Sequence, residues 1–216
     1  YDNNAPKTMN AHLHVLEAYT LLYQCWKDNG LKKRLEFCVD LFINRIYDPS
    51  RKHFNLFFDN EWNSLVEMDS YGHDVETGWL LCEAARTLEN QDLIEQTNQL
   101  ALDVTEACLA EGMSDKGYMI YEKKGDRKTK HASWWGQIET VIACVNAWQI
   151  SGSDVYLQSV DTVWTFVKDH MVDKEYGEWY SDCFDGEPKK EAPKVSMWRC
   201  PYHTVRLGVE MYNRLK

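Results

Sequence analysis

The chain has 216 residues, of which 44% are apolar and 27% charged, as in an ordinary globular domain. Its formal net charge is -10 and it contains no long basic run, which argues against a nucleic-acid backbone or an anionic membrane as its main partner. No stretch approaches the roughly 20 apolar residues that a membrane-spanning helix needs.

Apolar residues recur with helical spacing in seven segments of the chain. The first segment shows the pattern in four residues at intervals of three and four: Val15, Tyr19, Leu22 and Trp26. We therefore expect helices over residues 9–28, 31–47, 72–89, 91–111, 135–151, 153–171 and 203–214.

The connections between consecutive predicted helices are short, which is typical of αα-hairpins. Gly30, Gly112 and Gly152 lie where we expect helices to end.

Three segments between the helix pairs alternate aromatic and polar residues around a turn, a pattern that predicts short β-hairpins. They span residues 52–62, 116–126 and 176–186. An aromatic cluster follows each one, and these clusters recur about every 62 residues. A repeat of two helices and a decorated loop indicates an all-α toroid or solenoid whose loops gather at one end.

The seven cysteines are odd in number, include no CxxC pair and mostly fall in apolar helical patterns. We read them as free thiols, and with no signal peptide at the start of the chain they favour a cytoplasmic location. His12 and His14 form an HxH pair, but on a helix their side chains diverge by about 200°, so we expect no metal site there.

Two histidines lie where a loop runs into a predicted helix, at matching places two repeats apart. His73 is in a first helical turn, where the helix dipole disfavours imidazolium, and Glu76 follows one turn later. His203 ends the segment 198–203. Each could be a structural capping residue, but in a closed ring both would converge on one pore, where they could act as acid and base.

Two further groups are candidates for the wall of a site. Asn10, His14 and Glu17 form a polar stripe on the first helix, as either a satisfied core network or a pocket wall. Trp134 and Trp135 precede Glu139 at another helix start, and the tryptophans could equally be core residues. There is no glycine-rich phosphate loop, GxSxG elbow or HExxH motif, so dinucleotide, serine-hydrolase and zinc-protease chemistry lose their support.

Four motifs carry a resemblance to a known family: KTMNAHLHVLEAY at 7–19, YGHDVE at 71–76, WWGQIE at 134–139 and WRCPYH at 198–203. Together they resemble the N-acylglucosamine 2-epimerase family, and within it the cellobiose 2-epimerases. The resemblance implies an (α/α)6 barrel that reversibly inverts C2 of the reducing-end glucose of a β-1,4-disaccharide, through a cis-enediol(ate) and without a cofactor or metal.

The resemblance also implies roles for single residues. His73 and His203 would remove and return the C2 proton on opposite faces of the sugar. His14 would stabilise the enediolate, with Asn10 beside it, and Glu76 would orient His73.

Aromatic residues would bind the sugar rings by stacking, in the roles that the resemblance gives to Trp135, or its neighbour Trp134, and to Trp198. Glu139 joins these candidates as a binding residue because it is an acid in the first part of the same helix as the paired tryptophans.

The family's barrel has twelve helices and the sequence predicts seven. The chain also begins at Tyr1 rather than Met. We therefore expect residues 1–216 to be the C-terminal part of one barrel domain, completed by an N-terminal half or a partner chain.

Three alternatives stay open at this point. One is an aldose–ketose isomerase or N-acylglucosamine 2-epimerase of the same family, and another is a non-catalytic glycan-binding barrel. The third is an inverting glycosidase, which would need two carboxyl groups, such as Glu76 and Glu139, about 6.5–9.5 Å apart.

Overall fold

The computed structural model describes residues 5–216, and most of them are helical. The helices of this part of the chain are α1 (Met9–Cys25), α2 (Asn29–Leu41), α3 (Tyr71–Leu88), α4 (Gln91–Gly112), α5 (Trp134–Ser151), α6 (Val155–Phe166) and α7 (Tyr202–Arg214). Single π-helical turns, Phe42–Ile46 and Val167–Met171, extend α2 and α6. The seven expected helical segments are confirmed.

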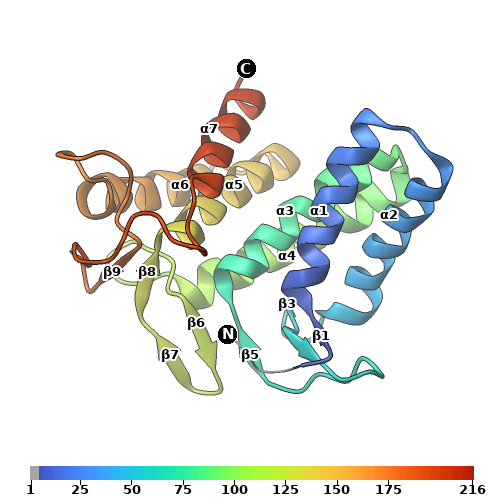
Figure 1. Cartoon of the computed structure of the whole chain (residues 1–216), viewed down its shortest axis with the longest axis horizontal. Coiled ribbons are helices and arrows are strands. Elements are labelled where there is room, and N and C mark those ends of the chain that lie inside the picture. The colour runs from blue at the N-terminus through green and yellow to red at the C-terminus, as the bar shows by residue number, and fades with distance from the viewer. Residues whose placement is uncertain (1–4) are drawn as a thin grey trace.

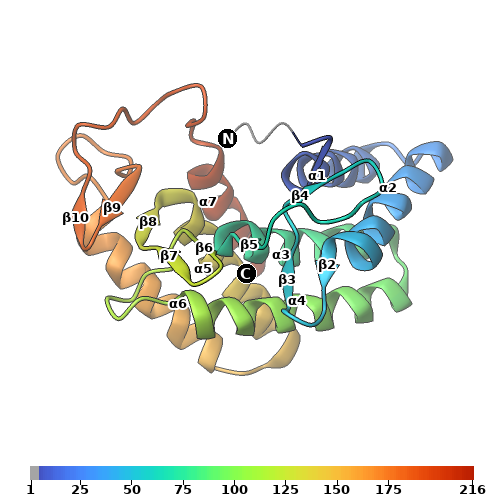
Figure 2. The same ribbon diagram turned by 90° about the horizontal axis from the view of Figure 1, so that it is seen from below.

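The helices form an arc of two layers (Figure 1). In the inner layer α3 packs against α1 and α5, and α5 packs against α7. In the outer layer α2, α4 and α6 each pack on the inner helix that precedes them. Figure 2 shows α4 and α6 outside α3 and α5. The helices α1 and α7 are therefore the two ends of this arc.

Short antiparallel strands lie together beside the N-terminal ends of the inner helices (Figure 1). They are β1 (Lys7–Thr8), β2 (Tyr47–Asp48), β3 (His53–Phe54), β4 (Phe57–Phe58), β5 (Met68–Asp69), β6 (Glu122–Lys124), β7 (Arg127–Thr129), β8 (His131–Ser133), β9 (Asp182–Phe184) and β10 (Glu187–Pro188). The strand that leads into an inner helix pairs with the segment that follows the next outer helix: β1 with β4, β5 with β6, and β8 with β9. This pairing repeats three times and confirms the predicted repeat, with its loops at one end.

The predicted hairpins are misplaced in the sequence. Residues 52–62 form no hairpin of their own, because β3 pairs back to β2 while β4 pairs with β1. The other two hairpins are β6–β7 and β9–β10. Their turns fall at Gly125 and at Asp185–Gly186, where the backbone has positive φ. Turn geometry, and not the alternation of aromatic residues, sets where the chain reverses.

Helix ends follow local capping chemistry. Thr8 and Ser133 cap α1 and α5 by accepting hydrogen bonds from the Ala11 and Gly136 amides. Gly152 ends α5 with a φ of 70°, and Gly112 is the last residue of α4, as predicted. Gly30 was wrongly expected to end a helix. It lies inside α2, because the Asp28 side chain accepts two amide hydrogen bonds and begins the helix there.

Apolar residues lie on two sides of α1. Met9, Leu13 and Leu16 are fully buried, whereas Val15, Leu22 and the C-cap residue Trp26, which showed the helical spacing, are 43%, 43% and 59% exposed. Val205, Val209 and Tyr212 form a similar exposed stripe on α7. Both ends of the arc therefore carry apolar residues that the rest of the described chain leaves in contact with solvent.

Two further observations bear on the composition. No helix among residues 5–216 is long and apolar enough to cross a bilayer. All seven cysteines are free, and five of them are buried.

The closest approach of α3 and α5 predicts a matched pair of glycine substitutions. A Cβ atom at Gly72 would lie 2.6 Å from the Trp135 ring and 3.1 Å from the Gly136 Cα, whereas one at Gly208 would meet nothing within 4 Å. We expect Gly72→Ala to lower the free energy of unfolding by about 1–3 kcal/mol through overpacking. Gly208→Ala should raise it by up to about 1 kcal/mol, since alanine favours the helix. Urea denaturation measures both, and equal effects would contradict this close packing.

Candidate active site

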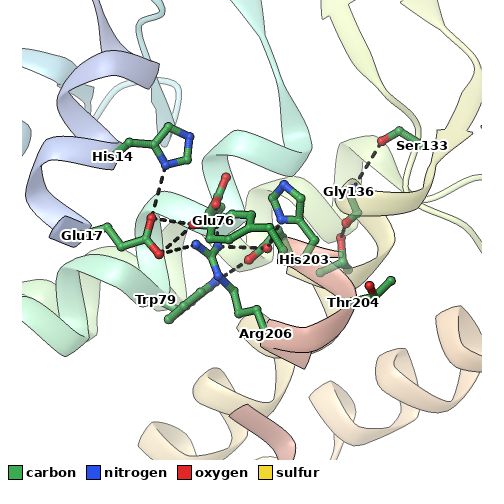
Figure 3. Close-up of polar contacts among 12 residues, drawn as sticks. His14, Glu17, Glu76, Trp79, Ser133, Gly136, His203, Thr204 and Arg206 are labelled. Atoms are coloured by element: carbon green, nitrogen blue, oxygen red, sulfur yellow. Dashed lines mark hydrogen bonds and ion pairs between the residues drawn. The ribbon is translucent and has the colours of Figure 1, made fainter. Parts of the chain in front are cut away.

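The first turns of the four inner helices bring the predicted histidines and acids to one place. Figure 3 shows His14 and Glu17 of α1, Glu76 of α3, and His203 and Arg206 of α7 around a common centre. The rings of His73 and His203 both contact the Trp135 ring, at 4.5 and 5.8 Å between ring centres. The convergence that the repeat predicted therefore holds in the structure.

His203 is held by a buried acid. Its Nδ1 lies 2.7 Å from Oε1 of Glu139, and the other oxygen of Glu139 accepts a hydrogen bond of 2.9 Å from the Trp79 indole. Burial alone would lower the pKa of His203, but the hydrogen bond and charge of Glu139 outweigh it and raise that pKa. With Nδ1 engaged, Nε2 is the ring atom left for chemistry.

The pKa of His73 is shifted in the opposite direction from that of His203. Burial, reinforced by the charges of His14 and His203, lowers its pKa to about 3. Its Nδ1 is 2.7 Å from the Ser70 hydroxyl, and its ring lies 4.5 Å from the Trp135 ring. The expectation that Glu76 orients His73 was wrong: Glu76 pairs with Arg206 instead.

The polar stripe of α1 faces the site. His14 Nδ1 lies 3.2 Å from Glu17 Oε2, and this hydrogen bond raises the pKa of His14 against the opposing effect of burial. Tyr202 donates its hydroxyl hydrogen to Glu17 at 2.5–2.6 Å. Asn10 is exposed one turn before His14. These contacts favour a pocket wall over a satisfied core network as the role of this stripe.

Glu76 and Glu139 lie close together in the interior, 1% and 0% exposed. Burial and the charge of Glu139 raise the pKa of Glu76 to about 7, while Arg206 opposes this shift. Oxygens of the two acids lie within 4.8 Å of each other. That spacing is shorter than the separation of an inverting glycosidase pair, and it removes the main support for that alternative.

The three candidate tryptophans occupy different environments. Trp135 is 9% exposed, with its ring 4.5 Å from His73 and 5.8 Å from His203. Trp134 lies beneath the guanidinium of Arg199, 5.0 Å from its ring centre. Trp198 is 85% exposed. Only Trp135 is in contact with both proton-transfer candidates.

Residues that the sequence reasoning missed complete the site. Arg206, Tyr202 and Trp79 bind the acids that hold the histidines. Arg206 lies one helical turn after His203, and this spacing was a signal that could have pointed to it.

Three clusters within residues 5–216 hold enough potential ligands for a metal ion. One is Glu76, Glu139 and His203, where Arg206 already neutralises the acids. The other two share His53, and they consist of His53 with Asp74 and Cys108, and His53 with Asp69 and Glu111.

The His53 clusters already contain cations. Arg51 pairs with Asp69, and Lys123 pairs with Glu111. The acids Asp69 and Glu111 therefore have partners without an ion.

A cavity of about 930 Å³ opens between α1 and α7, beside Arg206. Its lining includes the polar or aromatic residues Glu17, Trp79, Tyr202 and Arg206 and the apolar residues Leu21, Val205 and Val209. The site therefore continues into the open space of the arc.

Residues 2–206 match the family model of N-acylglucosamine 2-epimerase (GlcNAc 2-epimerase). The chain belongs to this family.

Relatives of known function support the same assignment. The cellobiose 2-epimerase of Bacteroides fragilis is 41% identical over 215 residues, and that of Dictyoglomus turgidum is 36% identical. The match covers 97% of this chain and 54% of each of these enzymes, so the chain spans about half the length of the curated relatives it matches.

Solved structures confirm the fold as an (α/α)6 barrel, here present over about half its length. The cellobiose 2-epimerase of Bacillus thermoamylovorans B4167 superposes with a TM-score of 0.93 at 36% identity, covering 97% of this chain and 54% of that one. A sugar epimerase from a ruminal bacterium superposes with a TM-score of 0.95 at 34% identity, covering 99% and 56%. A D-mannose isomerase shares the fold at 18% identity, with a TM-score of 0.76 and coverage of 96% and 54%.

The hydrogen bond between Glu139 and His203 predicts a pH-dependent change on substitution. Glu139→Gln removes the charge that raises the pKa of His203, so burial should then lower it below 6.5. In the unsubstituted chain the pair stabilises the fold below about pH 6.5, and this stability is lost as the pH rises through the folded pKa. NMR titration of His203 measures the shift, with Glu83→Gln as the control. An unchanged pKa of His203 in Glu139→Gln would contradict the claim that Glu139 raises this pKa.

Proposed function

We propose that the protein is a sugar 2-epimerase that inverts C2 of the reducing end of a β-1,4-disaccharide such as cellobiose. One observation carries the proposal: His73 and His203 have opposite proton affinities and lie on the same tryptophan, Trp135. A proton acceptor beside a proton donor is what inversion at carbon requires, because the proton must leave one face and return to the other. The two cellobiose 2-epimerases to which the chain is similar support the same reaction.

In the proposed reaction the open-chain sugar lies between the two histidines. With Nδ1–H donating to Ser70, the free Nε2 of His73 takes the C2 proton. The C–H electrons form the C1=C2 bond while the π electrons of the C1 carbonyl move onto O1, which gives an enediolate. His14 donates a hydrogen bond to the negative oxygen, next to Asn10. The carbonyl at C1 then re-forms while the C1=C2 π electrons take the Nε2 proton of His203 on the opposite face of C2, and proton exchange with water restores both rings.

The other candidate residues have supporting roles in this proposal. Trp135 stacks on the reducing-end sugar, and Glu139 holds the donor histidine. Trp134 and Trp198 stay predictions as stacking residues. Glu76 also stays a prediction as a binding residue, and in the structure it accepts a hydrogen bond from Arg206.

Related isomerisations share this chemistry, because an aldose–ketose isomerase or an N-acylglucosamine 2-epimerase passes through the same type of enediolate. The product therefore distinguishes them, and the experiment below detects each one. A non-catalytic glycan-binding barrel would need no acid to hold His203, so the Glu139 contact speaks against it.

We further propose that residues 1–216 are the C-terminal part of one barrel domain, with the remaining helices between α1 and α7. The share of about 54% of the relatives' length supports this arrangement, as do the exposed stripes on α1 and α7. A cytoplasmic location stays a prediction that rests on the free cysteines.

Solvent deuterium tests the reaction. With cellobiose in D2O, we expect the completed enzyme to place deuterium at C2 and to form the mannose-configured product, as followed by NMR. His203→Ala should lower the rate by at least about 100-fold, because it removes the proton donor. His170→Ala is the matched control, since His170 binds the carbonyl of Gly186 away from the site. A ketose product, or exchange that survives His203→Ala, would contradict the proposal.

The proposed barrel predicts a binding partner. The part of the Bacteroides fragilis enzyme that this chain does not cover, produced separately, should bind the chain and bury both apolar stripes. Val209→Asp should weaken this binding at least about 10-fold by placing a charge in the interface. Val155→Asp on the outer helix α6 is the control, because Val155 is similarly exposed, at 54%, and lies away from the gap. Calorimetry measures both, and equal effects would argue against this interface.

A further inference from the structure

Arg206 of α7 contacts acidic residues on each of the other three inner helices. It lies on α7 and is only 8% exposed. One guanidinium nitrogen donates to Glu76 at 2.6 Å and to Glu139 at 3.1 Å, and the other donates to Glu17 at 2.5 Å. These acids belong to α3, α5 and α1. Figure 3 shows Arg206 beside Glu17 and Glu76.

Two of these acids hold the histidines. Glu139 holds Nδ1 of His203, and Glu17 holds Nδ1 of His14. Arg206 therefore reaches each of these rings through one intervening acid.

The charges explain why a cation is needed at this position. Glu76 and Glu139 are fully buried neighbours, and two such carboxylates cannot both stay ionised without a positive partner. Glu17, Glu76 and Glu139 face Arg206 from the other helices, and His14 and His203 are the further titratable groups in contact with them. If Glu139 took up the proton, His203 would lose its charged acceptor.

The shape of the side chain matters as well as its charge. A guanidinium is planar and offers several donors in fixed directions, so that it can bind carboxylates on different sides at once. A lysine ammonium is a point charge on a flexible stem and does not fix three acids in this way. The rings of Tyr202 and Trp79 lie 4.1 and 5.3 Å from the guanidinium carbon and hold it in place.

We propose that Arg206 is the positioning residue for proton transfer, fixing Glu139 and Glu17 so that His203 and His14 present Nε2 to the sugar. The role rests on the proposed epimerase function. It assigns Arg206 an indirect part in catalysis, in which it changes the rate of proton transfer more than the binding of substrate.

Arg206→Lys tests the role, with Arg214→Lys as the matched control. Arg214 lies on the same helix and bridges Glu83, Asn146 and Glu210, none of which holds a histidine. We expect Arg206→Lys to lower kcat for C2 exchange by roughly 10- to 100-fold, with KM changed less than about 3-fold and the pH profile displaced. Arg214→Lys should keep the profile of the unsubstituted enzyme. An unchanged profile in Arg206→Lys, whatever its rate, would mean a merely structural role and overturn the proposal.

A double substitution separates position from charge. Arg206→Met with Glu76→Gln removes one cation and one acid, so the buried charges stay balanced. If Arg206 positions the acids, this variant should exchange the C2 proton as slowly as Arg206→Lys or more slowly, because Glu17 and Glu139 still lack their common partner. Recovery of the rate would show that Arg206 only neutralises Glu76, and would overturn the proposal.

A readout without activity keeps this inference separate from the proposed function. Long-range 1H–15N spectra of the 216-residue chain distinguish His203 protonated on Nδ1 from His203 protonated on Nε2. We expect the neutral ring to carry its proton on Nδ1 in the unsubstituted chain and in Arg214→Lys, and to become a mixture of tautomers in Arg206→Lys. A fixed Nδ1–H form in all three would overturn the role of Arg206, even if no sugar is turned over.

Discussion

Four inner helices meet at a buried group of charges in which one guanidinium binds three carboxylates. Removing charged groups from water is costly unless each has a partner, so these side chains fix one another's positions. Arg206 connects Glu17 of α1, Glu76 of α3 and Glu139 of α5, and two of these acids bind histidines. The curvature of the arc and the placing of the candidate catalytic groups therefore depend on the same contacts.

The same residue type has opposite proton affinities within this small space. His203 has a carboxylate on its ring and a raised pKa, whereas His73 has a serine hydroxyl and a pKa of about 3. Neither difference comes from the histidine itself. It comes from what each inner helix places beside the ring, and in this way a repeated scaffold provides two unlike groups from equivalent loops.

Periodicity was enough to predict all seven helices, because an amphipathic helix needs a regular apolar face. It was not enough to choose the buried face of α1, since Val15 and Leu22 are as regular as Leu13 and Leu16 but lie on the exposed side. The three histidines and Glu139 could be proposed from motifs. The partner of Glu76 could not, because Arg206 is 130 positions away and only the folded arc brings the two together.

The strand pairs at the loop end join residues that are closer in sequence than most of the residues joined by Arg206. Each of β1–β4, β5–β6 and β8–β9 closes within one repeat, so the entropy of loop closure is spread over short segments. The contacts of Arg206 with Glu17, Glu76 and Glu139 span 189, 130 and 67 positions. Contacts of such long range form late in folding when local units form early. The candidate proton-transfer groups are therefore brought together by contacts between repeats, whereas each strand pair closes within one repeat.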